Sequence, residues 1–216
     1  MKISNGLSED GVIVGNAYDK YGSSNPVVQH IMRGFDAALT QLVRRAAPSS
    51  IHEIGCGEGY WVLRWLKEGL IASGSDFSGT VIDIACENAG AQGVSPDVFA
   101  RRNIYDIEPD EVDADLVVCC EVLEHLVDPE RALRILESLR ASHLILSVPR
   151  EPLWSTMNLV RGKYVSALGN TPGHIQRWSR RAFLRLVARH FDIVEVCTPI
   201  PWTMVLCMPR SAPSHQ

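Results

Sequence analysis

Ile51–Tyr60 reads Ile-His-Glu-Ile-Gly-Cys-Gly-Glu-Gly-Tyr, a short apolar run that leads into a glycine-rich turn. The next segment, Trp61-Val-Leu-Arg-Trp-Leu-Lys67, carries apolar residues at helical spacing. A strand, a glycine turn and a helix in this order form the first unit of a nucleotide-binding α/β sheet. Because glycine has no Cβ, such a turn leaves room for a ligand against the backbone.

The spacing of the glycines separates the classes of nucleotide-binding turn. Gly55, Gly57 and Gly59 give Gly-x-Gly-x-Gly, whereas the dinucleotide fingerprint requires a glycine where Tyr60 stands. No Gly-Lys-Ser/Thr sequence ends the turn, which disfavours a phosphate-binding P-loop. The negative charge of Glu53, at the end of the strand, favours a ligand that carries an ammonium and a sulfonium over a pyrophosphate.

Two segments carry a resemblance to a known family. Glu53-Ile-Gly-Cys-Gly-Glu-Gly59 resembles motif I of the class I S-adenosylmethionine-dependent methyltransferases. Cys119-Cys-Glu-Val-Leu-Glu-His-Leu126 is similar to the segment after the fourth strand of many small-molecule methyltransferases, the quinone-biosynthesis enzymes among them. The resemblance covers 51–149 and the chain ending, and it implies an enzyme that uses S-adenosylmethionine.

The order of the elements agrees with this family. We expect strands at 50–54, 70–76, 97–103, 114–121, 143–149, 191–197 and 203–208, with helices between them. The predicted fold class is α/β: a doubly wound, mostly parallel seven-stranded sheet with a C-terminal antiparallel hairpin, the Rossmann-like methyltransferase fold. We expect one domain over 1–216, with an N-terminal arm at 1–25 and an irregular lid insertion at 150–177.

Composition sets limits on the class of protein. The chain has 216 residues, of which 46% are hydrophobic and 21% charged, as in a soluble globular domain. The net charge of −4 makes nucleic acid an unlikely partner and favours a small-molecule acceptor. The six cysteines form no Cys-x-x-Cys pair, and we find neither a signal peptide nor a membrane span. We therefore expect a reduced, cytoplasmic protein; its oligomeric state is not predicted.

The donor site is predicted at the ends of the first four strands. Asp76 ends the second strand about 20 residues past the glycine loop, where a carboxylate accepts hydrogen bonds from ribose hydroxyls; capping of the next helix is its alternative role. The resemblance implies an adenine contact from Asn103, with Asp106 as its rival. Cys119 and Cys120 lie at the carboxyl end of the fourth strand, where ligands bind in open α/β sheets, so their backbone carbonyls are candidates to contact the methionine ammonium. The predicted donor-binding residues are Glu53, Gly55, Cys56, Gly57, Gly59, Asp76, Phe77, Ser78, Asn103, Ile104, Cys119 and Cys120.

The acceptor site is predicted over the ends of the fourth and fifth strands. The loop at 150–177 leaves the fifth strand there, and long loops of this kind are commonly functional. Tyr18 and Tyr21 precede the first long helix and are candidates to close over the pocket. We predict that these tyrosines, together with Trp154 and Tyr164, contact the acceptor.

His125 and His174 are the candidate catalytic bases, because imidazole titrates near neutrality. A metal site is the alternative: Glu121, Glu124 and His125 stand at i, i+3 and i+4, and would share one face of a helix. This pattern, with His174 before a Trp-Ser-Arg segment, is similar to the small-RNA 3′-terminal 2′-O-methyltransferases. We assign no metal from the sequence and keep this alternative open.

The predicted function is methyl transfer from S-adenosylmethionine to an oxygen, nitrogen or carbon atom of a small, partly apolar molecule. Three alternatives are a metal-dependent RNA-terminus methyltransferase, a non-catalytic S-adenosylmethionine-binding module and a nicotinamide oxidoreductase. The RNA alternative would use Arg177, Arg180 and Arg181 to bind phosphates. The glycine spacing disfavours the oxidoreductase.

Overall fold

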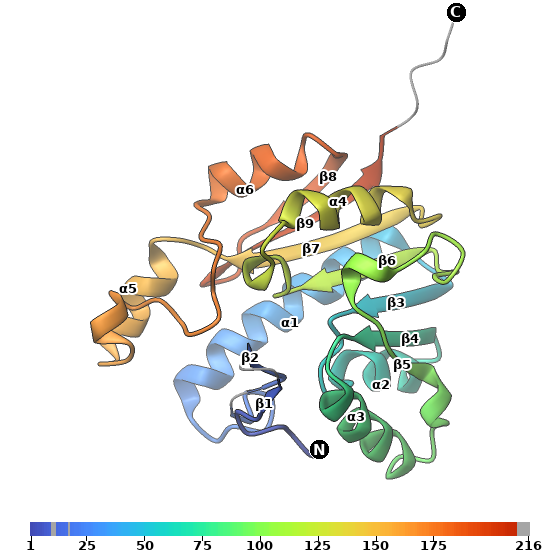
Figure 1. The fold of residues 1–216 in the computed structure, drawn as a ribbon, viewed down its shortest axis with the longest axis horizontal. Coiled ribbons are helices and arrows are strands. Elements are labelled where there is room, and N and C mark those ends of the chain that lie inside the picture. The colour runs from blue at the N-terminus through green and yellow to red at the C-terminus, as the bar shows by residue number, and fades with distance from the viewer. Residues whose placement is uncertain (10–11, 17, 211–216) are drawn as a thin grey trace, which may run out of the picture.

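A seven-stranded sheet runs through the molecule in the order β5-β4-β3-β6-β7-β9-β8 (Figure 1). The computed structural model describes residues 1–9, 12–16 and 18–210, so positions 211–216 of the predicted domain lie outside the described residues. The strands are β3 Ser50–Ile54, β4 Ile71–Asp76, β5 Phe99–Arg101, β6 Leu116–Cys120, β7 His143–Pro149, β8 Phe191–Cys197 and β9 Trp202–Pro209.

Strand direction confirms the predicted fold class. β5, β4, β3, β6 and β7 pair in parallel, while β9 pairs antiparallel with both β7 and β8. The carboxyl ends of the five parallel strands therefore meet at one edge. Ligands bind at this edge in open α/β sheets.

Helices cover both faces of the sheet. One face carries α1 Pro26–Ala46, α2 Tyr60–Lys67 and α3 Gly79–Gly90, and the other carries α4 Pro129–Ser138 and α6 Arg180–Val187. β6 shows why both layers form, because its buried residues alternate between them. Leu116 and Val118 pack under the first layer, while Val117 and Cys119 pack under the second.

Side-chain caps fix where the helices begin. The Asn25 side chain accepts hydrogen bonds from the N–H groups of Val27 and Val28 before Pro26 opens α1, as the sequence predicts. Ser78 caps α3 in the same way, and Ser179 caps α6. Ser78 therefore has the capping role that was the alternative for Asp76.

Two regions contain structure that the sequence did not reveal. The segment 150–177 was predicted to be irregular, which is wrong in part: it contains α5 Leu153–Val160 and the 3-10 helix η4 Val165–Ala167. The N-terminal arm contains two short paired strands, β1 Ser8–Glu9 and β2 Val12–Ile13. Three more 3-10 helices, η1 Pro96–Val98, η2 Ile104–Asp106 and η3 Leu123–His125, lie in the loops. In the described ranges, no helix combines the length and apolar character needed to cross a membrane.

Candidate active site

The glycine loop and the end of β4 are joined by hydrogen bonds to Asp76. Its Oδ2 accepts from the Gly57 N–H at 3.1 Å, and its Oδ1 accepts from the Ser78 N–H at 3.0 Å. Burial raises the pKa of Asp76, and these two backbone donors oppose that rise. Asp76 is thus held at the carboxyl edge of the sheet, in the place predicted for ribose recognition.

Gly57 is the glycine of this loop with open space beside it. A Cβ on Gly55 would lie 2.3 Å from Val122, and one on Gly59 would lie 2.4 Å from Phe99. A Cβ on Gly57 would have no neighbour within 4 Å in the described ranges. The first and third glycines are therefore required by packing, whereas Gly57 leaves a space that a ligand can occupy.

Glu53 has a buried carboxylate oxygen without a partner. Its side chain is 5% exposed, and Oε2 has no hydrogen bond among the described residues. Burial raises its pKa well above the usual range, opposed by the Lys20 ammonium and reinforced by Asp76. A buried oxygen in this state matches a cationic ligand group, because unpaired buried acceptors are costly.

The other predicted donor residues lie along the same edge. Phe77 is 42% exposed, and Ile104, the first residue of η2, is buried. The amide oxygen of Asn103 accepts from the Tyr105 N–H at 3.0 Å, which leaves one lone pair for the predicted adenine contact. Cys119 and Cys120 end β6, as predicted. The Cys56 side chain packs against Gly74 of β4. Their contacts with a donor stay predictions.

The N-terminal arm is tied to the glycine loop through Glu58. This side chain is 1% exposed and accepts from the Ser4 N–H, the Ser4 hydroxyl and the Asn16 N–H at 3.0, 2.8 and 2.7 Å. The Asn16 amide donates to its second oxygen. Burial acts to raise the pKa of Glu58, but these donors outweigh it and the pKa is lowered. Sequence reasoning missed this role, since the partners lie 42 and 54 positions away.

Lys20 is a second residue that sequence reasoning missed. Its ammonium lowers the pKa of three buried carboxyls, those of Glu53, Glu121 and Glu124. It also lies 5.2 Å from the centre of the Tyr21 ring. The arm therefore places a positive charge among the acidic residues at the carboxyl edge of the sheet. No sequence motif around Lys20 predicts this position.

An aromatic wall lies on the acceptor side. The Trp154 ring stacks on His174 at 5.8 Å between centroids and lies 5.9 Å from the Trp202 ring. His174 in turn meets His125 edge to face at 4.9 Å. The structure thus brings Trp154 and both predicted bases together, and it adds Trp202, which the sequence analysis did not single out.

The predicted tyrosines have different surroundings. Tyr21 stacks on Tyr60 at 3.6 Å, and its hydroxyl accepts from the Trp61 indole N–H at 3.0 Å. Tyr18 is 45% exposed, and the Lys163 ammonium lies over its ring, 5.7 Å from the ring centre. Tyr164 precedes η4 at the outer end of the insertion. Acceptor contacts by these residues and by Trp154 stay predictions.

The two candidate bases carry lowered pKa values. Burial lowers the pKa of His174 to about 4, with a further contribution from His125. Burial lowers the pKa of His125 although the residue as a whole is exposed, and the Gly173 carbonyl opposes this shift. Its Nδ1 lies 2.9 Å from the Gly173 carbonyl oxygen, which can only accept, so Nδ1 carries the proton and Nε2 has the free lone pair.

Glu121 departs from the arrangement that its spacing predicted. The helical segment is only the single turn η3, and Glu121 precedes it with a left-handed φ of 59°. Glu121 therefore does not share a helical face with Glu124 and His125. Its carboxylate accepts from the Trp202 indole N–H at 2.6 Å and the Ser147 hydroxyl at 3.3 Å, and burial raises its pKa to about 7.

Three of the four possible metal ligands do converge. Ligand atoms of Glu124, His125 and His174 all lie within 4.8 Å of one another. Glu124 is 1% exposed, and neither of its carboxylate oxygens has a partner among the described residues. Burial and the charge of Glu121 raise its pKa well above the usual range. A carboxylate and two imidazoles fit a divalent transition metal.

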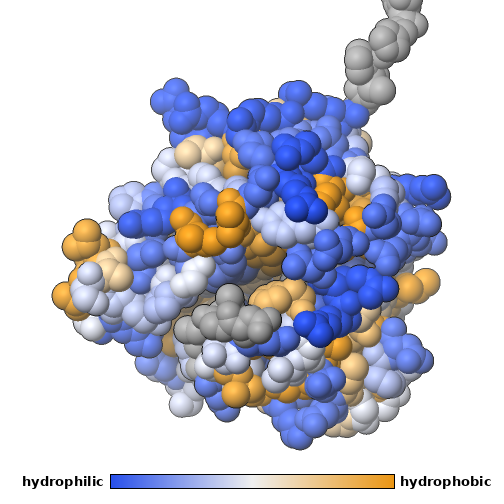
Figure 2. All heavy atoms as spheres, viewed as in Figure 1, coloured by the Kyte–Doolittle hydropathy of each residue, from blue (hydrophilic) through white to orange (hydrophobic). Residues whose placement is uncertain are grey.

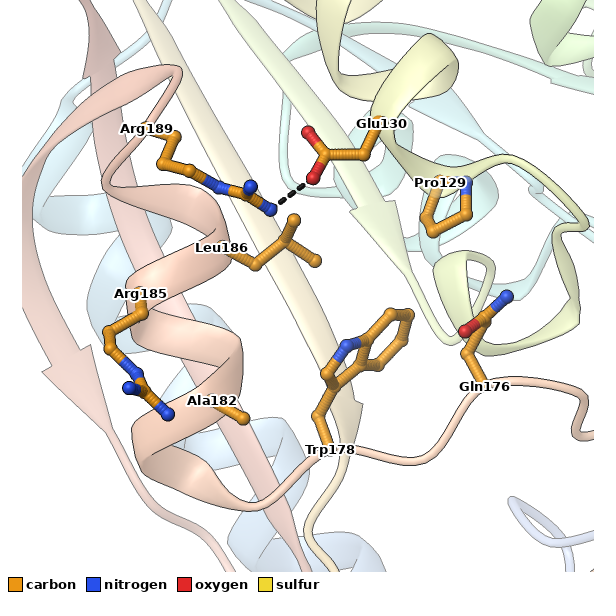
Figure 3. Close-up of a pocket in the computed structure, with 8 residues that line it drawn as sticks. All are labelled: Pro129, Glu130, Gln176, Trp178, Ala182, Arg185, Leu186 and Arg189. Carbon is orange, nitrogen blue, oxygen red and sulfur yellow. Dashed lines mark hydrogen bonds and ion pairs between the residues drawn. The ribbon is translucent and has the colours of Figure 1, made fainter.

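A separate cavity of about 510 Å³ lies between α4 and α6 (Figure 3). None of its lining residues is a predicted site residue, and it lies apart from the glycine loop. The residues that line it are Pro129, Glu130, Gln176, Trp178, Ala182, Arg185, Leu186 and Arg189. We therefore place the candidate active site at the carboxyl edge of the sheet and not in this cavity.

Comparisons with known proteins identify the family and the fold. The methyltransferase domain family matches residues 28–196. A ubiquinone biosynthesis O-methyltransferase from Coxiella burnetii is 32% identical over 82 residues, which cover 38% of this chain and 35% of that protein. The match thus spans about a third of that relative's length.

Two solved structures show the same fold. One is magnesium protoporphyrin IX methyltransferase from Synechocystis PCC 6803 with bound SAH, which has a TM-score of 0.65 at 18% identity. The match covers 88% of this chain and 90% of that chain. The methyltransferase domain of bacterial CtHen1 has a TM-score of 0.63 at 16% identity, with coverages of 82% and 99%.

The chain belongs to the methyltransferase domain family. The family match confirms the predicted class, an S-adenosylmethionine-dependent methyltransferase of class I. The relatives include enzymes of different acceptors, so the family leaves the acceptor open.

Proposed function

We propose that this protein transfers a methyl group from S-adenosylmethionine to an oxygen, nitrogen or carbon atom of a small, partly apolar molecule. The observation that carries the proposal is the buried Glu53 oxygen, which has no partner among the described residues, beside the open space at Gly57. On the other side of β6, a wall of Trp154, Trp202 and His174 offers apolar surface to an acceptor.

The residues of the donor side fit S-adenosylmethionine. The Glu53 carboxylate would take the ammonium group, Asp76 the ribose hydroxyls and the space at Gly57 the body of the ligand. When bound, the donor supplies an electrophilic methyl group on a sulfonium. The chain itself contributes orientation and removal of water, which lower the barrier by holding the reactants in line.

The histidines supply a proton acceptor. With its pKa lowered to about 4, His174 is unprotonated at neutral pH. His125 presents its free Nε2, since Nδ1 is engaged by Gly173. A hydroxyl acceptor loses its proton during methylation, and either imidazole can take it.

A second candidate function, a metal-dependent RNA-terminus methyltransferase, is favoured by one specific observation. Both oxygens of Glu124 are buried beside His125 and His174, and neither has a partner in the part of the chain that the structure describes. These three side chains would hold a divalent ion, which would polarise hydroxyl groups of the acceptor. The Hen1 domain among the solved neighbours has the same fold but shares only 16% identity.

One labelling experiment separates these functions. The protein is incubated with methyl-labelled S-adenosylmethionine and cell extract, and the label is counted in organic-soluble, RNA and protein fractions. We expect label in the organic-soluble fraction, unchanged by a chelator and absent with Gly57→Val. Label in RNA that a chelator removes would support the second candidate. Donor binding without any labelled product would identify a non-catalytic binding module.

A further inference from the structure

The segment from Pro152 to Phe191 contains no aspartate or glutamate, although the whole chain carries a net charge of −4. All 25 acidic residues of the protein lie outside it. It holds seven lysines and arginines: Arg161, Lys163, Arg177, Arg180, Arg181, Arg185 and Arg189. The chain thus has a one-sided charge distribution, which methyl transfer to a small molecule does not require.

The first part of this segment folds into a hairpin made of α5 and η4, which projects from the body of the protein (Figure 1). Hydrogen bonds close it: the Lys163 N–H donates to the Asn158 carbonyl at 2.8 Å, and the Asn158 amide donates to the Gly169 carbonyl at 2.9 Å. A Cβ on Gly169 would lie 2.1 Å from the Ser155 carbonyl oxygen, so the two arms pack closely. The hairpin is therefore a built element and not a loose loop.

The tip of the hairpin has its apolar side chains on the outside. Val160 is 83% exposed, Leu168 73% and Val165 60%, whereas the polar Ser155 and Asn158 are buried. Figure 2 shows the hydrophobic atoms at the left edge of the view, over this hairpin. Burying polar and exposing apolar residues reverses the usual pattern, and such exposed patches mark interaction surfaces.

We propose that the tip of the α5–η4 hairpin docks on an anionic lipid surface. Arg161 and Lys163 are exposed beside the apolar tip, so the tip combines side chains that enter the bilayer interface with charges that attract anionic headgroups. A second copy of this chain is a poorer occupant, because a symmetric contact would bring the basic residues of both copies together.

The position of the tip connects docking with the candidate active site. The Lys163 ammonium lies 5.7 Å from the Tyr18 ring centre, so the hairpin borders the N-terminal arm. Trp154, at the base of the hairpin, stacks on His174. A docked hairpin would therefore hold the acceptor side of the site at the membrane surface, where an apolar acceptor partitions. Docking itself does not depend on the proposed function.

The test is flotation of the full chain with two vesicle compositions, phosphatidylcholine alone and phosphatidylcholine with phosphatidylglycerol. We expect binding to the anionic vesicles that weakens with salt. Arg161→Gln with Lys163→Gln should lower the partition coefficient about 25-fold, since each basic residue near the surface is worth about fivefold. Val160→Ser with Leu168→Ser should lower it by at least about tenfold.

Matched controls keep the test specific. Val127→Ser removes an equally exposed valine, also 83% exposed, from outside the hairpin. Arg33→Gln with Arg44→Gln removes two exposed charges from α1. Both controls should bind vesicles as the unaltered protein does, and circular dichroism verifies that all variants fold.

Three results would overturn the proposal. The first is no binding to anionic vesicles by the folded protein. The second is binding that the control variants weaken as much as the tip variants do. The third is a concentration-dependent dimer, abolished by Val160→Ser, that forms without vesicle binding; the tip would then be a contact between copies of this chain.

Discussion

Gly57 and Gly69 offer a matched test of where the donor lies. Both have a left-handed backbone, with φ of 54° and 87°, and a Cβ on either would meet no atom of the described residues within 4 Å. A valine at either position therefore carries a similar backbone cost of about 1–2 kcal/mol in unfolding free energy. Only Gly57 lies in the loop that we assign to the donor.

Gly57→Val should reduce the affinity for S-adenosylhomocysteine at least about 100-fold, which corresponds to about 2.7 kcal/mol. The reason is twofold: the valine fills the space that the ligand needs, and a shift of the loop disturbs the Gly57 N–H bond to Asp76. Gly69→Val should leave that affinity unchanged. Calorimetric titration measures both, with thermal unfolding as the stability control. Equal affinities in the two folded variants would refute the assignment of the donor site.

Three further predictions follow from the site. Asp76→Ala should cost about 1–3 kcal/mol of donor binding by calorimetry, the value of a hydrogen-bonded charged acceptor, and unchanged affinity would remove the ribose assignment. Glu58→Gln should lower the free energy of unfolding by about 1–3 kcal/mol. Because the pKa of Glu58 is lowered in the folded state, the stability that its carboxylate contributes is present above about pH 4.5 and is lost as the pH falls through the folded pKa. Unfolding curves of the variant and the unaltered protein should therefore converge in acid. Deleting 155–170 should keep S-adenosylhomocysteine affinity and abolish methyl transfer. The fold should tolerate this deletion, because the Trp154 indole donates to Thr171 at 2.8 Å and the cut ends lie together. Loss of donor binding in a folded deletion variant would contradict the acceptor role of the hairpin.

The main sheet was predictable because its strands are buried apolar runs. The bounds expected for the first and fifth strands, 50–54 and 143–149, agree with those of β3 and β7. The fold class followed from the order of these runs. The sequence predicted room for a ligand at all three glycines of the loop, but the described residues leave open space only at Gly57, because Val122 and Phe99 pack against Gly55 and Gly59.

The insertion was harder to read from sequence because its burial pattern is reversed. Helical periodicity is recognised from apolar residues on the buried face. In α5, the fully buried residues are Ser155 and Asn158, while Val160 is exposed. Leu153, Met157 and Val160 do stand at helical spacing, but this apolar stripe is short and is not the buried face, so the helix was missed.

The candidate site was predicted in its local parts but not in its long-range ones. Glu53 and Asp76 lie at the carboxyl ends of β3 and β4, as the predicted strands indicated. Spacing alone suggested that Glu121 would join Glu124, yet the left-handed backbone at Glu121 turns its carboxylate toward Trp202. Lys20 reaches the acids from a segment without any motif, and only the folded chain shows it.

The assignment of the donor site is tested most directly by calorimetric titration of the unaltered protein and of Glu53→Gln, each with S-adenosylhomocysteine and with NAD. We expect saturable binding of S-adenosylhomocysteine at one site per chain, weaker binding in Glu53→Gln and no binding of NAD. Binding of NAD, or equal affinity of the two proteins for S-adenosylhomocysteine, would contradict this assignment.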